Sequence, residues 1–472
     1  MVIASAMQPI WRFMVENNTQ LKEMIRSMVI DLLQGQKQEA ASSQPVKQAP
    51  RGQVEPGVFD TVDDAIQAAK AAQARFEDCT LATREKVIAD IRAAMRPRVQ
   101  ELAQKTVEET GMGRVADKVL KLNLTLDKTP GVEDLVTECE TGDNGMTLYE
   151  LSAYGVIGAI TPSTNPAETL ICNTIGMLAA GNAVFFSVHP GAKHLSRLLV
   201  SELNQIIAKS IGIENLIVTL REPSIESAQE MMLHPDVSLL VVTGGPGVVK
   251  QALQSGKKVI GAGAGNPPAF VDETADIKKA AQDIVLGASL DNNILCIAEK
   301  SVVAMRQIEP QLVQEMVKVG CVLIDNQQDI QRLVDLTVLP NGTPNKKFVG
   351  KNASVILDAA HIPYNGDPRL IIMRAPKNHP FAVIEMLMPI LPVVTVDSFD
   401  EGLDVCLMLE AGLHHTATMH SLNMERLNRM ARKMKTSIFV KNGPSYAGLG
   451  FSGEGTTTFT IATPTGESTT SA

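Results

Sequence analysis

Hydrophobic residues recur with different periods along the chain, and the changes of period divide it into regions. Over residues 18–33, Leu, Met, Ile and Val stand three and four positions apart, which predicts a helix with a single apolar stripe. Residues 34–56 are rich in Gln, Ala, Ser, Pro and Gly, a composition typical of a flexible linker. The helix therefore either docks on a hydrophobic partner or packs back on its own domain.

From residue 57 to about residue 130 the pattern is helical, and beyond it short apolar runs alternate with amphipathic stretches. This alternation predicts a parallel sheet covered by helices on both faces. A second run of the same kind follows residue 266, with helix 275–288, strand 300–305, helix 309–318, strands near 354 and over 381–396, and helix 400–412. The predicted fold class is therefore α/β with two lobes, and ligands favour the crevices of such folds.

Composition and charge narrow the possible functions. The 472 residues carry a net charge of −9, which argues against nucleic-acid binding because phosphates need a basic face. No apolar run reaches the roughly 18 residues of a membrane-spanning helix. The balanced charge of the helix at 18–33 also argues against an anionic membrane surface. Six cysteines without paired spacing indicate a reducing compartment and no disulfide framework.

Two short stretches end a predicted strand and begin a helix, where backbone amides can bind a ligand. In "VVTGGPGVVK" (241–250) the glycines allow the amides to face a phosphate, but a plain tight turn explains the pattern equally well. In "TPSTNP" (161–166), Asn165 either offers an amide donor or simply caps the helix.

The cysteines and histidines add one candidate nucleophile. Cys296 follows "DNN" in a predicted loop leading into a helix, a setting in which donors can stabilise a thiolate. The other five cysteines are better explained as small buried hydrophobes. The stretch "HHTATMH" (414–420) lacks the spacing of a zinc-binding helix, so it predicts a strand and no metal site.

Five motifs follow one another in a fixed order: "TPSTNP", "VTGG", "GAGAGNPP", "DNNILC" and "EMLMPILPV". Their order and spacing resemble the aldehyde dehydrogenase superfamily. The resemblance is closest to the coenzyme-A-acylating branch, which handles short aldehydes inside bacterial microcompartments, and it extends from about residue 57 to the end of the chain.

The resemblance implies a covalent mechanism that uses NAD and coenzyme A. Cys296 would be the nucleophile, and the Asn165 amide with the Cys296 backbone N–H would form the oxyanion hole. Glu385 would hold the nicotinamide ribose. The other cofactor-binding residues that the resemblance implies are Pro162, His189, Thr243, Gly244, Gly245 and Gly263.

The resemblance also implies a domain organisation. It assigns 1–33 to a segment with a targeting helix and 34–56 to the linker. Residues 57–265 would form the NAD- and CoA-binding domain, with a β flap at about 138–152, and residues 266–455 the catalytic domain. Residues 456–472 would form a C-terminal oligomerisation segment, which we expect to continue further. The targeting helix would bind a shell protein, and the enzyme would be a homodimer or homotetramer in the lumen of a microcompartment in the cytoplasm.

A missing carboxylate predicts the product. Hydrolytic members of the family carry a Glu where this chain has "GAGAGNPP", and no Asp or Glu occurs from 256 to 271. Without that general base water is a poor nucleophile, so we expect Gly261–Gly265 to leave a path open for coenzyme A. The substrate would be propionaldehyde or acetaldehyde, and NADP is an alternative to NAD. The alternative functions are a hydrolytic aldehyde dehydrogenase that gives the free acid and a non-catalytic microcompartment cargo or scaffold.

Overall fold

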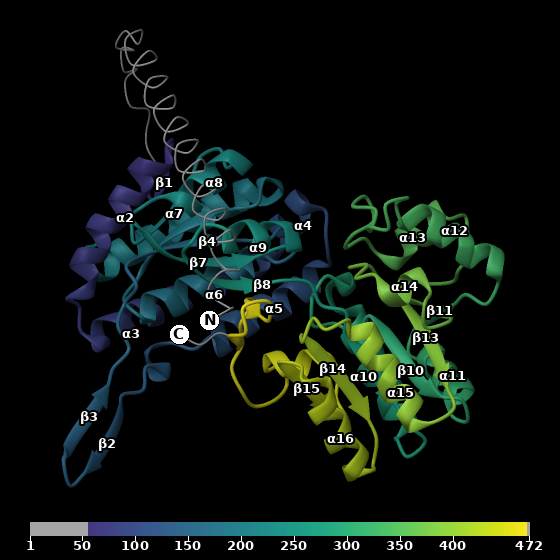
Figure 1. The fold of residues 1–472 in the computed structure, drawn as a ribbon. Helices are drawn as coiled ribbons and strands as arrows, with labels where there is room; N and C mark the ends of the chain where they lie inside the picture. The colour runs from purple at the N-terminus through teal and green to yellow at the C-terminus, as the bar shows by residue number, and fades with distance from the viewer. Residues whose placement is uncertain (1–54, 470–472) are drawn as a thin grey trace, which may run out of the picture. The chain divides into compact units, whose positions relative to one another are not determined.

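The computed structural model describes residues 55–469. The helix expected over 18–33 and most of the linker expected over 34–56 lie outside the described residues. Two parallel sheets organise the described part, and the chain passes from the first to the second between residues 262 and 268 (Figure 1).

The first sheet has six strands in the order β1-β6-β5-β4-β7-β8, all parallel. Every residue of β4 and β5 is buried, so both faces of the sheet are covered, as the continuous apolar runs of its strands require. The strands are β1 (Val58–Phe59), β4 (Val156–Ile160), β5 (Ala183–Ser187), β6 (Ile217–Leu220), β7 (Val237–Thr243) and β8 (Lys258–Ala262). The helices are α2 (Val62–Glu77), α3 (Leu81–Met95), α4 (Val99–Thr110), α5 (Val115–Lys128), α6 (Pro166–Ala179), α7 (Lys193–Ile211), α8 (Ile225–Leu233) and α9 (Pro246–Leu253).

The second sheet has seven parallel strands in the order β11-β12-β13-β10-β9-β14-β15. Its strands are β9 (Pro268–Val271), β10 (Ser301–Met305), β11 (Cys321–Leu323), β12 (Leu370–Arg374), β13 (Ile390–Val396), β14 (Thr416–His420) and β15 (Ile438–Lys441). Its helices are α10 (Ile277–Ser289), α11 (Glu309–Lys318), α12 (Gln327–Thr337), α13 (Ala353–Ala359), α14 (Pro380–Val383), α15 (Phe399–Glu410) and α16 (Met424–Met434). The α/β fold class with two lobes is thus confirmed.

Two strand predictions in the second lobe are wrong. The strand expected near 354 is helix α13, because Ala353, Ile356 and Leu357 are buried on one helical face while Val355 is exposed. Short apolar runs do not distinguish a strand from a helical turn by period alone. The strand expected over 381–396 begins only at Ile390, after the short helix α14, and strands β11 and β12 were not predicted.

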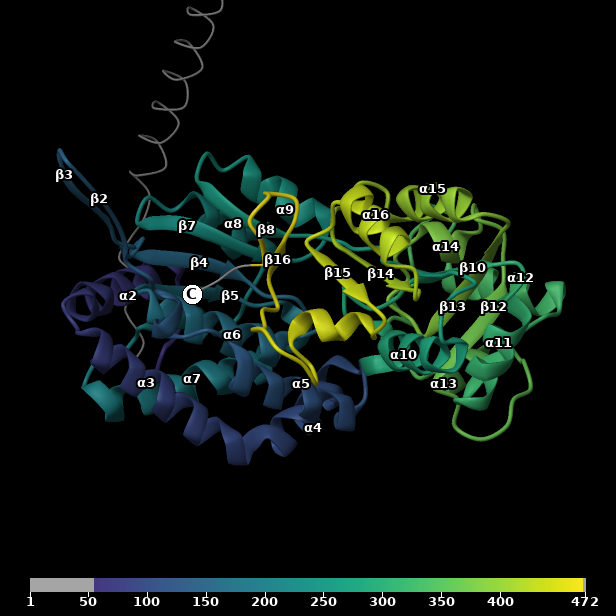
Figure 2. The ribbon, with the colours of Figure 1, turned by 90° about the horizontal axis from the view of Figure 1, so that it is seen from below.

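An antiparallel hairpin and a returning C-terminal segment complete the described chain. Hairpin β2–β3 (Glu138–Gly142 and Gly145–Tyr149) is exposed at every position and extends away from the first sheet (Figure 1). After η5 (Ser445–Leu449), the chain returns to the first sheet, where β16 (Ile461–Ala462) lies beside β8 and pairs with β17 (Ser468–Thr469) (Figure 2). The Gly261 N–H donates to Thr465 Oγ1 at 2.9 Å and fixes this return.

The strand order predicts a ligand site at the carboxyl ends of β4 and β7 in the first sheet. Strand β4 lies between β5 and β7, so the connections that leave β4 and β7 run in opposite directions at their carboxyl ends, the usual position of a ligand site.

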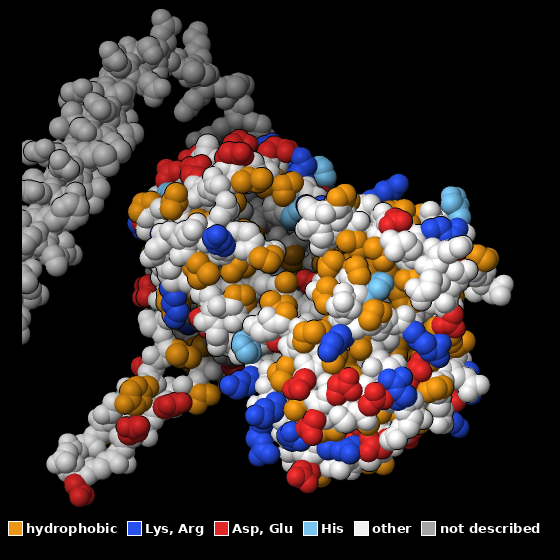
Figure 3. Space-filling model, turned by 45° about the vertical axis from the view of Figure 1, so that its right-hand side comes forward, with side chains coloured by type: hydrophobic (Ala, Val, Ile, Leu, Met, Phe, Trp, Pro, Cys, Tyr) orange, Lys and Arg blue, Asp and Glu red, His pale blue; other side chains and the backbone are white. Residues whose placement is uncertain are grey.

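On the face drawn in Figure 3, acidic and basic side chains are intermixed. None of the helices between 55 and 469 is long and apolar enough to span a membrane.

Candidate active site

Cys296 is positioned by a left-handed turn that follows helix α10. In the turn η4 (Leu290–Asn293), Asp291, Asn292 and Asn293 have φ values of 50°, 56° and 66°. Asp and Asn tolerate this conformation better than other residues with a Cβ, which explains the "DNN" sequence. The turn therefore leaves a helix and leads through Cys296 to β10, and the expectation of a loop leading into a helix is wrong.

The asparagines of this turn brace the loop. The amide of Asn293 donates to the Ala288 carbonyl at 2.7 Å and to the Glu299 carbonyl at 2.9 Å, and the Asn292 amide donates to the Gly350 carbonyl at 2.9 Å. These bonds close the loop on itself and on the neighbouring segment. The asparagines thus fix the backbone that presents Cys296.

Lys300 supports the same loop from inside. Its ammonium group is 3% exposed and donates to the Asn293 carbonyl at 2.8 Å, to Asn293 Oδ1 at 2.6 Å and to the Leu295 carbonyl at 2.9 Å. Burial lowers the pKa of Lys300 to about 8. The protonated form thus places a cation near Cys296 and links Asn293 to Leu295 in the loop that precedes it.

The surroundings of Cys296 favour the protonated thiol over the thiolate. The thiol is partly exposed, yet enough protein surrounds it that burial, followed by the carboxylate of Glu385, raises the pKa of Cys296 to about 12. Lys300 opposes this rise. Burial therefore disfavours the nucleophilic thiolate most, and the two charged neighbours change its stability in opposite directions.

The glycine-rich run passes directly behind Cys296. A Cβ at Gly265 would lie 2.7 Å from the Cys296 carbonyl oxygen and 2.8 Å from the His415 ring, and the Gly265 N–H donates to Glu385 Oε1 at 3.1 Å. Gly263 likewise leaves no room for a side chain, since its Cβ would lie 2.9 Å from Pro464. Close packing thus explains Gly263 and Gly265 of this run, and the path for coenzyme A stays a prediction.

His415 adds an acceptor that the sequence analysis did not assign. It is 1% exposed, its Nδ1 lies 2.9 Å from Thr416 Oγ1, and its Nε2 has no hydrogen-bond partner within the described part of the chain. Burial, and then the charge of Lys300, lower the pKa of His415 to about 4. A neutral imidazole therefore lies against Gly265 and the Cys296 loop at neutral pH.

Asn165 is held by a lysine and does not cap its helix. It precedes α6, is 8% exposed and makes no side-chain cap bond to the helix amides that the structure describes, so the helix-cap interpretation is wrong. Its Oδ1 instead accepts a hydrogen bond from the ammonium of Lys121 on α5. Its Nδ2 has a long contact of 3.3 Å to Thr164 Oγ1. The amide nitrogen is the group of Asn165 that remains available to a ligand.

A buried group of four charged side chains surrounds that lysine. Lys118, Lys121, Glu168 and Asp291 are each 0% exposed. Lys121 Nζ lies 2.9 Å from Glu168 Oε1 and also pairs with Asp291 Oδ2, which Lys118 approaches to 2.9 Å. We call these four residues the lysine–carboxylate cluster. Two lysines three positions apart in the "ETGMGRVADKVLK" stretch were the only sequence signal for it.

The expected cofactor residues other than Glu385 lie at the carboxyl ends of the first sheet, as does the expected catalytic residue Asn165. The residues concerned are Pro162 and Asn165 after β4, His189 after β5, Thr243, Gly244 and Gly245 at the end of β7, and Gly263 after β8. The Thr243 hydroxyl lies 3.0 Å from that of Thr460, and the Gly244 N–H donates to the Ala262 carbonyl at 3.2 Å.

The turn that begins α9 fits a phosphate-bearing ligand. A Cβ at Gly245 or Gly247 would meet nothing within 4 Å, so there is room for a ligand to approach the backbone. Gly245 precedes the first residue of α9, where unpaired amides and the positive end of the helix dipole favour an anion. His189 is exposed nearby, with Nδ1 accepting from the Gly191 N–H at 3.0 Å.

The remaining histidines and cysteines form no second centre. His415 and His420 are buried and His414 is not, and between residues 55 and 469 no three His, Cys, Asp or Glu side chains are placed to hold a metal ion. Cys172, Cys321 and Cys406 are buried, as expected of small hydrophobes. Cys79 and Cys139 differ from that expectation, since Cys79 is partly exposed and Cys139 is exposed on hairpin strand β2.

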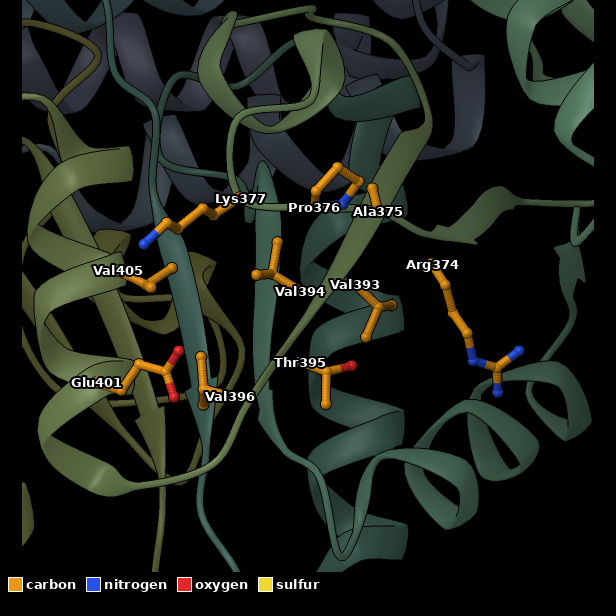
Figure 4. Close-up of a pocket in the computed structure, with 10 residues that line it drawn as sticks. All are labelled: Arg374, Ala375, Pro376, Lys377, Val393, Val394, Thr395, Val396, Glu401 and Val405. Carbon is orange, nitrogen blue, oxygen red and sulfur yellow. The ribbon is translucent and has the colours of Figure 1, made fainter.

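A hollow of about 370 Å³ lies elsewhere, at the carboxyl ends of β12 and β13 (Figure 4). Its one guanidinium, that of Arg374, already pairs with Glu309 at 2.8 Å and Asp325 at 2.9 Å. None of the expected site residues lines this hollow. The lining residues are Arg374, Ala375, Pro376, Lys377, Val393, Val394, Thr395, Val396, Glu401 and Val405.

Comparison with known proteins gives one consistent family. The family model described as aldehyde dehydrogenase family matches residues 33–459. The chain is 50% identical to the propanal dehydrogenase (CoA-propanoylating) of Salmonella typhimurium over 457 residues, covering 97% of this chain and 96% of that protein.

Two solved structures are similar in both sequence and fold. The crystal structure of Rhodopseudomonas palustris propionaldehyde dehydrogenase with bound CoA and an acylated cysteine has a TM-score of 0.87 at 49% identity, covering 89% of this chain and 96% of that one. A propionaldehyde dehydrogenase from the fucose utilisation bacterial microcompartment of Clostridium phytofermentans has a TM-score of 0.87 at 48% identity, with the same coverage of 89% and 96%.

Proposed function

The chain belongs to the aldehyde dehydrogenase family, and we propose that it oxidises a short-chain aldehyde, propionaldehyde or acetaldehyde, to the acyl-CoA with NAD as the hydride acceptor. Cys296 is the nucleophile of this proposal. Asn165 and the Cys296 backbone N–H stabilise the oxyanion, and Glu385 with the turn at Thr243–Gly245 binds the coenzyme.

The proposed reaction has two half-reactions. In the first, the Cys296 thiolate attacks the aldehyde carbon, an S–C bond forms, and the carbonyl oxygen becomes an oxyanion near the Asn165 amide. The oxyanion then collapses, a hydride leaves the same carbon, and a thioester remains on Cys296. The nicotinamide ring, when bound, supplies the hydride acceptor. In the second, the sulfur of coenzyme A attacks the thioester, the Cys296 thiolate leaves, and acyl-CoA is released.

One observation supports transfer to coenzyme A over hydrolysis. The segment that packs behind Cys296 contains Gly265 and supplies no Asp or Glu from 256 to 271. His415, which also lies against Gly265, has a pKa of about 4 and is a weak base for activating water at neutral pH. A thioester at Cys296 can therefore persist until a thiol attacks it.

The test measures NADH formation from propionaldehyde and NAD by the purified protein, with and without coenzyme A. We expect multiple turnovers only with coenzyme A, after a stoichiometric burst without it. Steady turnover without coenzyme A would instead indicate a hydrolytic aldehyde dehydrogenase. The Cys296→Ser variant serves as the control: unchanged turnover in this variant would contradict the covalent mechanism, and no turnover in wild type would favour the cargo or scaffold alternative.

The proposal includes an assembly and a location. The exposed hairpin β2–β3 bears Met146, Leu148 and Tyr149 and is suited to bind another subunit in a homodimer or homotetramer. Residues 18–33 are proposed to bind a shell protein and to place the enzyme in the lumen of a cytoplasmic microcompartment. Deletion of 1–33 should abolish co-purification with shell protein and leave turnover unchanged, whereas retained co-purification would contradict the targeting role.

A further inference from the structure

A charged side chain touches the far end of the Asn165 amide. Lys121 extends from α5, and its ammonium donates to Asn165 Oδ1 at the start of α6. Both side chains are buried, with Lys121 at 0% and Asn165 at 8% exposure. The contact therefore lies on the opposite side of the amide from the nitrogen that the proposed oxyanion hole requires.

We propose that Lys121 is a positioning residue, which fixes the orientation of the Asn165 amide so that Nδ2 faces the oxyanion formed at Cys296. This inference rests on the proposed function of Asn165 as an oxyanion donor. It adds a residue on another helix, which contacts Asn165 and acts through it.

Hydrogen-bonding chemistry gives the contact a single polarity. An ammonium has three donors and no acceptor, so it can pair only with the amide oxygen. Rotating the amide by 180° would bring two donor groups face to face and would leave Lys121 with one acceptor fewer in a buried site. Without Lys121 the Asn165 amide would have no such preference. Its contact from Nδ2 to Thr164 Oγ1 is 3.3 Å long and too weak to fix the orientation.

The lysine–carboxylate cluster keeps the charge of Lys121 in place. Glu168 and Asp291 both pair with its Nζ, and burial of a lysine without such partners would favour the neutral amine. Their charges raise the pKa of Lys121 above its ordinary value against the effect of burial. The two carboxylates therefore favour the ammonium form of Lys121, which donates to Asn165.

The cluster also joins the two halves of the proposed oxyanion hole. Asp291 belongs to the turn that positions Cys296, and Glu168 lies in the first turn of the helix that Asn165 precedes. A single lysine thus contacts the element that carries the nucleophile and the element that carries the amide donor. The spacing between these two elements depends on a contact that neither supplies alone.

The test compares two reactions of Cys296 in the full-length protein. Acylation by p-nitrophenyl acetate forms an S–C bond, passes through an oxyanion and releases p-nitrophenolate, which is followed as a burst. Alkylation by iodoacetamide forms an S–C bond at a saturated carbon, releases iodide and passes through no oxyanion. Neither reaction uses NAD or coenzyme A, so the outcome is independent of whether acyl-CoA is the natural product.

We expect the Lys121→Met variant to lose about 10- to 100-fold in burst rate, less than or equal to the roughly 10²- to 10³-fold loss typical of removing an oxyanion donor. Its iodoacetamide rate should stay within about twofold of wild type, because burial, Glu385 and Lys300 set the pKa of Cys296. In an Asn165→Ala background, Lys121→Met should cause little further loss, since a residue acting through Asn165 has nothing left to position.

Lys118→Met is the matched control. Lys118 is an equally buried lysine of the same cluster, pairs with Asp291 and donates to the Thr164 carbonyl, but has no bond to the Asn165 side chain. Its burst rate should fall less than that of Lys121→Met, because Lys118 makes no hydrogen bond to the Asn165 amide. Equal burst losses in the two lysine variants, or full loss from Lys121→Met in the Asn165→Ala background, would overturn the proposal. If Lys121→Met does not fold, Lys121→Gln replaces it, because the glutamine amide can still donate to Asn165. For this variant, a large further loss of burst rate in the Asn165→Ala background would refute the proposal.

Discussion

The reactivity of Cys296 should depend on two buried charges of opposite sign. Its pKa of about 12 exceeds the ordinary value of 9.0 by about 3 units, which corresponds to roughly 4 kcal/mol against ionisation. At pH 8 only about one thiol in 10⁴ is then a thiolate. Burial is the largest cause, the carboxylate of Glu385 is the second, and Lys300 opposes both.

The carboxylate of Glu385 disfavours the Cys296 thiolate. Glu385 Oε1 accepts a hydrogen bond from the Gly265 N–H at 3.1 Å. Gly265 in turn lies against Cys296, since a Cβ added to it would be 2.7 Å from the Cys296 carbonyl oxygen. At an effective dielectric constant of about 20, a nearby unit charge is worth on the order of 2 kcal/mol. Partial exposure of both groups reduces this, so we expect Glu385→Gln to accelerate alkylation of Cys296 about tenfold. Lys300→Met should slow it by a similar factor.

The assay measures alkylation by iodoacetamide across about pH 6 to 10, with peptide mass spectrometry reporting Cys296 and Cys139 in the same sample. Cys139 is exposed on hairpin strand β2 and serves as the internal reference thiol. Burial raises the pKa of Glu385 itself, so the difference between wild type and Glu385→Gln should grow as the pH rises and the carboxyl ionises. A Cys296 rate that is unchanged or lower in Glu385→Gln, relative to Cys139, would refute this account of the thiol.

Two further predictions concern stability. Gly265→Ala should lower the free energy of unfolding by about 1 to 3 kcal/mol and reduce NADH formation, because its Cβ would overlap the Cys296 carbonyl and the His415 ring. Gly245→Ala is the control: its Cβ would enter open space, so the melting temperature should stay unchanged. Burial lowers the pKa of His420 from 6.5 to about 4, so the unfolded chain binds its proton first and the stability due to this group, full above pH 6.5, is lost as the pH falls towards 4. Between pH 7 and 5 the His420 contribution to the free energy of unfolding, measured by urea unfolding, should fall by about 2 kcal/mol. If a His420→Gln variant loses as much stability as wild type over that range, the prediction is contradicted.

The sequence by itself determined the features that depend on local pattern. Alternation of short apolar runs with amphipathic stretches gave the two α/β lobes, because a parallel sheet needs strands that are apolar on both faces. Motif order singled out Cys296, Asn165, Glu385 and the turn at Thr243–Gly245, and in the first sheet Asn165 follows strand β4 and that turn lies at the end of strand β7. Local pattern was insufficient for α13, whose seven residues are too few to establish a helical period.

Only the tertiary structure decided how the site is charged and held. Lys121, Glu168 and Asp291 lie on three separate elements. Their positions in the sequence do not show that they form buried ion pairs with one another. The same holds for Cys296, where Glu385 and Lys300 act in opposite directions. Electrostatic energies depend on distance and on the exclusion of water, and packing of the whole domain sets both. The glycine run, which the sequence suggested as an opening, is for that same reason a place where backbone and rings pack closely behind the nucleophile.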